Sequence, residues 1–258
     1  MVFDPDTLSS DLFLGGKIRI LQPKIGYRAG VDPVLLAASV PVVSGQSVLE
    51  LGCGAGVASL CLAARVPGLA LSGVELQDSY ADLARQNAAA NGQNMVVYQA
   101  DLRKLPDALR QASFDHVIMN PPYYPSAHGT SAADGGRDLA LREQIALADW
   151  LAVATRRLRP KGVLTVIQDA RRLPELLGAL DQRLGAVRVL PISARRNRPA
   201  GLVILQARKG SRADFQLLAP LLMHQGERHE KDGESYTPQI RQVLRHGAGL
   251  DLAAVHQK

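Results

Sequence analysis

The chain alternates short apolar runs with longer stretches in which apolar residues recur at helical spacing. Runs rich in Val, Ile and Leu predict buried strands, and there are seven: 48–51, 70–75, 96–101, 114–119, 162–168, 186–192 and 201–207. Four stretches between them predict helices: 57–64, 78–91, 141–158 and 172–184. Strands that alternate with helices build a parallel sheet with crossover helices on both faces. The last two strands are joined by a short loop, so the final strand is predicted to be antiparallel. The pattern predicts an α/β fold with a seven-stranded, mostly parallel sheet.

Residues 1–40 are predicted to form a separate N-terminal unit. Two strand-like halves of Phe13–Leu21 meet at Gly15-Gly16, which predicts a hairpin. Pro33–Val40 then predicts a short apolar helix, with Asp32 as its N-cap.

The rest of the chain is predicted to divide where the last strand ends. Residues 41–210 hold the strands and form the main domain, and residues 211–258 are a polar, glycine-interrupted extension. One helix is predicted in that extension, at Pro238–His246. Its histidines lack a companion Cys or Asp at ligand spacing, so no metal site is predicted.

A glycine-rich turn follows the first strand of the main domain. Gly52, Gly54 and Gly56 come directly after Val48–Leu51, and a helix is predicted to begin at Val57. A strand, a glycine turn and a helix form the layout of a nucleoside site at the carboxyl edge of a parallel sheet. Val57 stands where a dinucleotide-binding fingerprint has its third glycine or alanine, which disfavours a pyrophosphate ligand.

Two of the following strands end in carboxylates. Glu75 ends the second strand at the distance from the glycine turn where an acid binds ribose hydroxyls in nucleotide folds. Asp101 ends the third strand, where its carboxylate could accept a hydrogen bond from an adenine amine. Each acid could equally serve as a helix N-cap or a turn residue.

The fourth strand ends in Asn120-Pro121-Pro122-Tyr123-Tyr124. Two prolines fix φ and remove two backbone donors, so carbonyl groups are left to face a ligand. The Asn120 side-chain oxygen and the Pro121 carbonyl are two acceptors on a stiff frame, which suits an NH₂ group. Tyr123 adds a flat face on which a base could stack. The simpler interpretation is a proline-rich loop that only ends the strand.

Together these motifs resemble the class I S-adenosylmethionine-dependent methyltransferases, and most closely the bacterial enzymes that methylate N6 of the adenine beside the anticodon of a valine tRNA. The resemblance covers Phe13 to Lys209 and includes Gly26–Ala37, similar to the segment that folds over the methionine end of the cofactor in that family. It implies a Rossmann-like fold, with residues 1–40 covering the cofactor site. The implied target-amine site is Asn120, Pro121 and Tyr123. The implied cofactor contacts are Arg28, Gly30, Asp32, Glu50, Gly52, Gly54, Glu75, Asp101, Leu102 and Asn120.

The same motif leaves other functions open. Asn-Pro-Pro-Tyr also occurs in protein glutamine methyltransferases and, with Phe, in rRNA guanine N2-methyltransferases, so it specifies an amine or amide nitrogen better than the molecule that carries it. A non-catalytic nucleotide- or RNA-binding module and a dinucleotide-dependent oxidoreductase are further alternatives. The intact motif and both acids disfavour the first, and the glycine spacing disfavours the second.

The chain has a net charge of +6, and its positive charge is concentrated in the second half. Residues 1–130 hold 9 Lys and Arg against 11 Asp and Glu, whereas residues 131–258 hold 21 against 13. This asymmetry predicts a polyanion partner, and the resemblance implies that this partner is the anticodon stem-loop of a tRNA. The loops after the fifth and sixth strands are favoured for phosphate contacts, and the second of these loops contains Arg195, Arg196 and Arg198. Tyr123 and Tyr124 are the predicted contacts to the base. The other clusters are Arg156, Arg157, Arg159 and Lys161, and Arg208, Lys209 and Arg212.

Three observations bear on the compartment. No apolar stretch approaches the ~20 residues that span a bilayer, and Met1–Leu12 lacks a signal-peptide core. Two cysteines, Cys53 and Cys61, cannot form a disulfide framework, so a cytoplasmic location without membrane attachment is expected. The Gly- and Ser-rich stretch 126–137, which contains His128, is either a lid over the substrate or a surface insertion.

Overall fold

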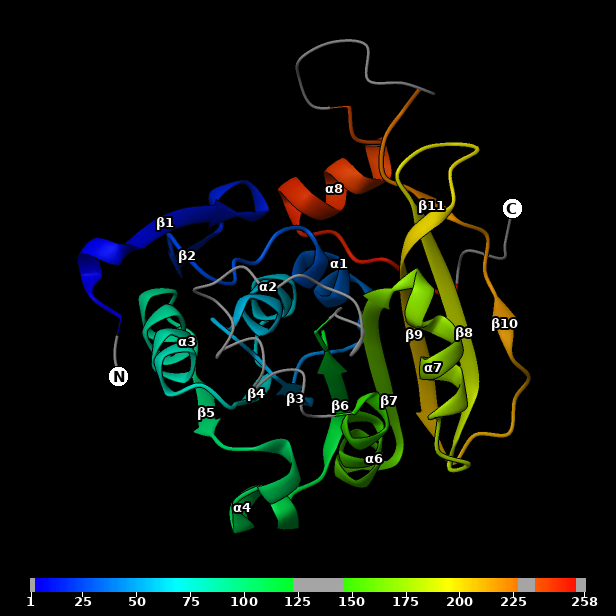
Figure 1. The fold of residues 1–258 in the computed structure, drawn as a ribbon, viewed down its shortest axis with the longest axis horizontal. Helices are drawn as coiled ribbons and strands as arrows, with labels where there is room; N and C mark the ends of the chain where they lie inside the picture. Colours follow the sequence, from blue (N-terminus) through cyan, green and yellow to red (C-terminus); the bar gives the residue numbers. More distant parts are fainter. Residues whose placement is uncertain (1–2, 123–145, 227–234, 254–258) are drawn as a thin grey trace, which may run out of the picture.

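The computed structural model describes residues 3–122, 146–226 and 235–253. The described residues form one large sheet and a separate two-stranded hairpin (Figure 1). The large sheet has the strand order β10-β8-β9-β7-β6-β3-β4-β5, with β11 paired to β8. Its strands are β3 (Ser47–Leu51), β4 (Ala70–Glu75), β5 (Met95–Gln99), β6 (Phe114–Met119), β7 (Leu158–Asp169), β8 (Leu184–Ser193), β9 (Ala200–Lys209), β10 (Gln216–Leu217) and β11 (Leu221–Leu222).

The sheet confirms the predicted fold class. The seven expected strands are β3 to β9, and β9 is the antiparallel strand, between β7 and β8. Two short strands that the sequence pattern did not indicate, β10 and β11, add to the edge parallel to β8. Since β9 runs against both neighbours, β8 points the same way as β7, β6 and β3. The edge where these strands end is called the carboxyl edge below, and the opposite one the amino edge.

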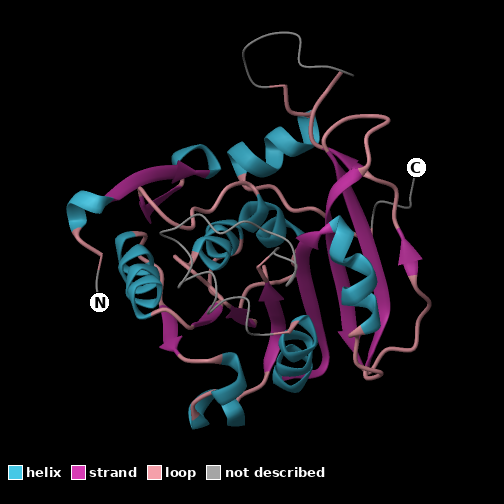
Figure 2. Cartoon of the chain, viewed as in Figure 1, coloured by secondary structure: helices cyan, strands magenta, loops and turns pink. Residues whose placement is uncertain are grey.

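Helices cover both faces of the sheet (Figure 2). One face packs against α1 (Asp32–Ser39), α2 (Val57–Arg65), α3 (Asp78–Ala90) and α8 (Pro238–His246). The other packs against α4 (Asp107–Gln111), α6 (Leu147–Arg157) and α7 (Leu173–Gly178). Strand residues divide between these two cores with the period of two that a pleated strand requires: Ile118 belongs to the first, whereas Val117 and Met119 belong to the second.

The N-terminal hairpin consists of β1 (Leu8–Phe13) and β2 (Ile18–Pro23), with a short 3-10 turn at Leu14–Gly16 between them, as the Gly15-Gly16 pair predicted. It is anchored to α3 by asparagine side chains. Asn87 accepts from the backbone N–H of Leu21 at 2.8 Å and donates to its carbonyl at 3.1 Å. Because Asn87 also donates to the Ala55 carbonyl at 3.0 Å, one buried amide joins the hairpin to the glycine turn.

Three local predictions were wrong. Asp32 is the first residue of α1 and not its cap, since Val31 holds the cap position. The helix expected at 172–184 is only Leu173–Gly178, because the Asp181 carboxylate accepts from the Arg183 N–H at 2.8 Å and forms a turn before β8. The helix expected from residue 141 begins at Leu147, and residues up to 145 lie outside the described ranges.

Candidate active site

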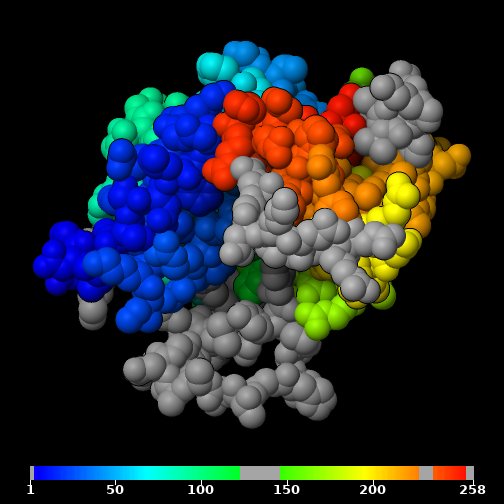
Figure 3. Space-filling view, turned by 90° about the horizontal axis from the view of Figure 1, so that it is seen from above, coloured from blue at the N-terminus to red at the C-terminus, as the bar shows by residue number. Residues whose placement is uncertain are grey.

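The glycine turn and the Asn-Pro-Pro motif lie side by side at the carboxyl edge. β3 pairs in parallel with β6, with Leu51 opposite Met119, and with β4, with Leu51 opposite Val74. Gly52 and Asn120 are therefore level, each one residue beyond its strand. Figure 3 looks down on this edge and shows the green end of β6 between the blue N-terminal segments and the yellow-green segment that follows β7.

The glycine turn depends on backbone conformations that favour glycine. Gly52, Gly54 and Gly56 have φ values of 66°, 54° and 83°. A Cβ on Gly52 would lie 2.5 Å from the Trp150 ring, whereas one on Gly54 would meet only Tyr27, at 3.8 Å. Gly52 is thus required both by its backbone and by the packing of α6, and Gly54 faces more open space.

Glu75 supports this turn from the end of β4. One carboxylate oxygen accepts from the Gly54 N–H at 2.8 Å, and the other accepts from the Gln77 N–H at 3.0 Å. The side chain is 6% exposed. Each oxygen keeps a second lone pair, so the predicted bonds to ribose hydroxyls remain compatible with these contacts.

Glu50 is the most perturbed carboxyl of the site. It lies within β3, is 4% exposed, and accepts from the Ser59 N–H at 3.0 Å and the Ser59 hydroxyl at 2.5 Å. Burial raises the pKa of Glu50 to about 7, although the bonds from Ser59 oppose the shift and the Glu75 charge adds to it. Strongly shifted groups in a cleft are typical of functional sites.

Asp101 takes the capping role that was left open for it. It stands at the N-cap of a 3-10 turn (Leu102–Lys104) and accepts from the Arg103 N–H at 2.8 Å. The Arg103 guanidinium also pairs with it at 2.7 Å, and this bond lowers the pKa of Asp101. The Leu102 side chain is buried in the core beneath α6. The predicted adenine contacts of both residues remain predictions.

Asn120 presents a bare acceptor. Its Oδ1 is buried and has no hydrogen-bond partner among the described residues. Pro121 is buried beside it, and its carbonyl accepts from Gln168 Nε2 at 3.4 Å. The Pro122 carbonyl accepts from Arg172 Nη1 at 2.7 Å. A buried amide oxygen without a hydrogen-bond donor lowers the stability of a fold by roughly 1–3 kcal/mol. Such an unpartnered atom is typical of a position where a ligand supplies the donor.

Gln168 and Arg172 are contacts that sequence analysis missed, and no spacing rule connects them to a motif some fifty residues earlier. Tyr123, Tyr124, His128 and the stretch 126–137 lie outside the described residues.

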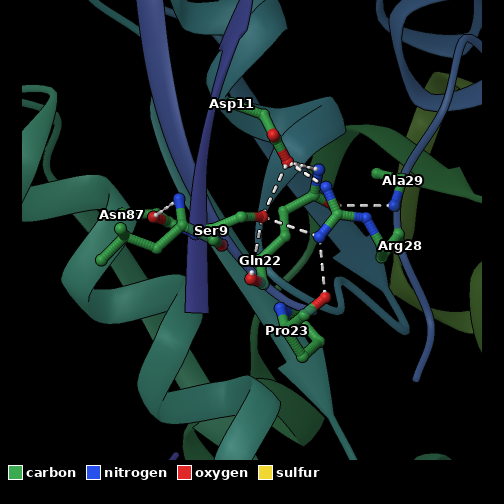
Figure 4. A network of polar contacts seen from close by, with 8 residues as sticks. Ser9, Asp11, Gln22, Pro23, Arg28, Ala29 and Asn87 are labelled. Carbon is green, nitrogen blue, oxygen red and sulfur yellow. Dashed lines mark hydrogen bonds and ion pairs between the residues drawn. The ribbon is translucent and has the colours of Figure 1, made fainter. Parts of the chain in front are cut away.

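The segment between β2 and α1 lies beside the glycine turn, since a Cβ on Gly54 would lie 3.8 Å from the Tyr27 ring. Arg28, however, is bound to the hairpin (Figure 4): its guanidinium donates to Asp11 at 2.6 Å, to Ser9 at 2.7 Å and to the Pro23 carbonyl at 2.9 Å. In these contacts Arg28 fixes the path of the segment. Gly30 and Asp32 follow at the start of α1.

The arginine clusters occupy opposite edges of the sheet. The turn between β8 and β9 lies at the carboxyl edge (Figure 1). Arg196 and Arg198 in this turn are exposed. Arg195 in the same turn donates to the carbonyls of Gln225 and Gly226 and to the Ser235 hydroxyl, so it holds the C-terminal extension.

The clusters at 156–161 and 208–212 lie at the amino edge, and several members are occupied with backbone carbonyls. Arg157 donates to the carbonyls of Leu109, Arg110 and Ala112. Lys209 donates to those of Thr155 and Leu158. Arg157 and Lys209 thus serve the fold, and a contribution of these two clusters to binding a polyanion stays a prediction. A cavity of about 520 Å³ also lies at the amino edge, away from Asn120.

No helix within the described residues is both long and apolar enough to cross a membrane.

Comparison with known proteins agrees with the site. The family described as "Methyltransferase small domain" matches residues 29–195. A tRNA1(Val) (adenine(37)-N6)-methyltransferase from Porphyromonas gingivalis is 30% identical over 203 residues, which cover 71% of this chain and 77% of that protein.

Two solved structures share the fold. A predicted O-methyltransferase from Agrobacterium tumefaciens, protein Atu636, has a TM-score of 0.68 at 27% identity, covering 85% of this chain and 98% of its own. The 16S rRNA N2 G1207 methyltransferase of T. thermophilus, solved with AdoMet and guanosine, has a TM-score of 0.55 at 23% identity over 78% of this chain and 50% of its own. The family match extends over more than half of the sequence, and the chain therefore belongs to the methyltransferase small domain family and is a methyltransferase.

Proposed function

We propose that this enzyme transfers a methyl group from S-adenosylmethionine to the exocyclic N6 amine of an adenine in tRNA. The observation that carries the proposal is the buried, unpartnered Asn120 Oδ1, level with a glycine turn on the neighbouring strand. An NH₂ group has two hydrogens to donate, and Asn120 and the Pro121 carbonyl are two adjacent acceptors.

The residues at the carboxyl edge fit the cofactor. Gly54 leaves room for close approach of a ligand to the backbone, Glu75 binds the Gly54 N–H of the turn, and Glu50 binds Ser59 in the helix that follows it. The residues proposed to hold the cofactor are Arg28, Gly30, Asp32, Glu50, Gly52, Gly54, Glu75, Asp101, Leu102 and Asn120. When bound, the cofactor would supply an electrophilic methyl group, and its sulfur would leave as a neutral sulfide with the electron pair of the broken S–C bond.

The chain's own part in the reaction is to hold the amine. The lone pair of an adenine amine is delocalised into the ring, so the nitrogen is a poor nucleophile. Asn120 Oδ1 and the Pro121 carbonyl bind both hydrogens and favour a more tetrahedral nitrogen, whose lone pair is then free to attack. The nitrogen becomes acidic as its bond to carbon forms, and it loses one proton to water. The rate therefore depends on positioning, and no strong base is needed.

We also propose an RNA substrate, which the name of the Porphyromonas relative and the exposed Arg196 and Arg198 support. An adenine must leave the base stack to reach Asn120, and Tyr123 and Tyr124 are proposed to stack on it. Arg195, Arg196 and Arg198 are proposed to bind phosphates of the anticodon stem-loop. The free, buried Cys53 and Cys61 suit the reducing cytoplasm, where we place this reaction.

The experiment is methyl transfer from labelled S-adenosylmethionine to unmodified tRNA transcripts, read by mass spectrometry of the nucleosides. N6-methyladenosine in a valine tRNA is expected, and a transcript whose target adenine is replaced by uridine is the control. Calorimetry is expected to show binding of S-adenosylmethionine and none of NAD. Label in a protein glutamine or in rRNA guanine, with none in tRNA, would contradict the proposed substrate.

A further inference from the structure

The end of β7 lies directly beside the Asn-Pro-Pro motif. β6 and β7 are parallel, with Met119 opposite Val166, so Pro121 is level with Gln168. Gln168 is fully buried and donates through Nε2 to the Pro121 carbonyl at 3.4 Å. Its Oε1 accepts from the Asp169 N–H at 2.8 Å. Because the Asp169 N–H requires an oxygen, this bond fixes which end of the amide faces Pro121.

A second donor reaches the next carbonyl. Arg172 Nη1 donates to the Pro122 carbonyl at 2.7 Å, and its Nε and Nη2 pair with the Glu175 carboxylate at 3.0 and 2.8 Å. The Arg172 side chain is 17% exposed. The end of β7 and the 3-10 turn that precedes α7 thus bind two consecutive proline carbonyls.

The bonds to the Pro121 and Pro122 carbonyls hold a segment whose two prolines cannot donate backbone hydrogen bonds. Proline has no N–H, so the carbonyl is the one backbone polar group through which either proline can be held. The Pro121 carbonyl has two lone pairs and keeps one free, while Asn120 Oδ1 keeps both. The spacing of these two acceptors therefore depends on Gln168.

We propose that Gln168, with Arg172 as a second tether, is a positioning residue that sets the Pro121 carbonyl at the distance from Asn120 Oδ1 that an NH₂ group requires. This inference rests on the proposed function, since it concerns the same amine site. Gln168 acts through Pro121 and does not touch the reacting atoms.

The first test compares Gln168→Leu with Gln206→Leu. Gln206 is a matched control: it is buried in the same sheet, on β9, and donates to the Ser39 carbonyl and to Thr165. Both variants are expected to lower Tm. Only Gln168→Leu is expected to slow single-turnover methylation, by roughly 10- to 100-fold, with the Kd for S-adenosylmethionine changed less than about twofold. Equal rates in the two variants would overturn the proposal.

The second test uses Gln168→Glu. When its carboxyl is protonated, this glutamate is nearly isosteric with the original glutamine. Its O–H can donate to Pro121 and its C=O can accept from Asp169, whereas the ionised form has no donor. The charged neighbours are paired, Asp169 with Arg171 and Arg172 with Glu175, and the β9 partner is the apolar Val203. The rate of the variant relative to wild type is therefore expected to rise several-fold as pH falls from about 9 to about 6. A flat ratio would contradict the positioning role.

A third measurement separates this inference from the choice of substrate. Sinefungin carries an amine where S-adenosylmethionine carries its methyl group, so it can use the same two acceptors without RNA. Gln168→Leu is expected to lower the affinity for sinefungin relative to S-adenosylhomocysteine by about 5-fold or more, and Gln206→Leu is not. If wild type methylates no tRNA but this ratio falls, the proposed substrate fails and the positioning role stands. An unchanged ratio would overturn it.

Discussion

Glu50 shows how a single buried carboxyl links the stability of this chain to its chemistry. A carboxyl whose pKa is raised to about 7 by burial holds a proton more tightly when folded than when unfolded, where its ordinary value is 4.5. Above the unfolded pKa this difference destabilises the fold, and the penalty grows until pH passes about 7. The fold tolerates this loss of stability beside the glycine turn. Strongly shifted carboxyl groups are common at functional sites, where a charge is needed for a ligand.

Replacing Glu50 by Gln is expected to make the protein more stable at pH 8 but not at pH 5. The gain at pH 8 is about 3 kcal/mol, since the pKa of Glu50 rises from 4.5 to about 7 and one pKa unit corresponds to ~1.4 kcal/mol. The amide can still accept from Ser59. Thermal unfolding at the two pH values measures the difference, and titration with S-adenosylmethionine is expected to show weaker binding by the more stable variant. An equal change in stability at both pH values would show that burial of the charge is not the cause.

At the scale of elements, the glycine turn and α6 are fitted to each other. Gly52 has a left-handed backbone, and the ring of Trp150 occupies the place where a side chain would begin. Gly92 has nearly the same φ, 63° against 66°, but open space around it. The two positions therefore separate backbone strain from packing.

Gly92→Ala is expected to cost only the left-handed strain, roughly 1–2 kcal/mol. Gly52→Ala is expected to cost about 2 kcal/mol more, because Trp150 must move. Denaturant unfolding measures both. Trp150 is the single tryptophan of the chain, so its emission is expected to shift in Gly52→Ala and stay unchanged in Gly92→Ala. Equal losses of stability in the two variants would mean that α6 does not pack on the turn as described.

Sequence reasoning succeeded where it rested on sheet geometry. Gly52 and Asn120 each follow a predicted strand of one mostly parallel sheet, whose strand ends share an edge, and the register of β3 and β6 places the two residues level. It failed where a side chain binds a backbone carbonyl far along the chain, as Gln168 does, because any donor of the right length can make such a bond. The Asp32 cap was wrong by a single position, within the usual uncertainty of helix ends.

At the scale of the whole molecule, the position of the arginines matters more than their number. The second half of the chain is basic, yet Arg157 and Lys209 bind carbonyls at the ends of α4 and α6 on the amino edge. The exposed Arg196 and Arg198 lie at the carboxyl edge, the same edge of the sheet as Asn120. An RNA whose base enters the site could therefore reach them.

The double variant Arg196→Gln, Arg198→Gln is expected to weaken tRNA binding roughly tenfold and to reduce the salt slope of log Kd by about 1.4, since each phosphate contact contributes ~0.7. Arg156→Gln, Arg212→Gln removes the same charge at the amino edge and serves as the control. Filter binding between about 50 and 200 mM salt measures both. Identical slopes for the two double variants would show that net charge, and not this turn, attracts the RNA.

The most direct test of the account is the rate of methyl transfer in Asn120→Ala. Single-turnover experiments at saturating S-adenosylmethionine and tRNA isolate the chemical step, and calorimetry gives the cofactor Kd separately. The account predicts a rate lower by about 100-fold or more, because Asn120 Oδ1 binds the reacting amine, with the cofactor Kd within about threefold of wild type, because the other proposed cofactor contacts remain. A rate close to that of wild type, with the cofactor still bound, would contradict it.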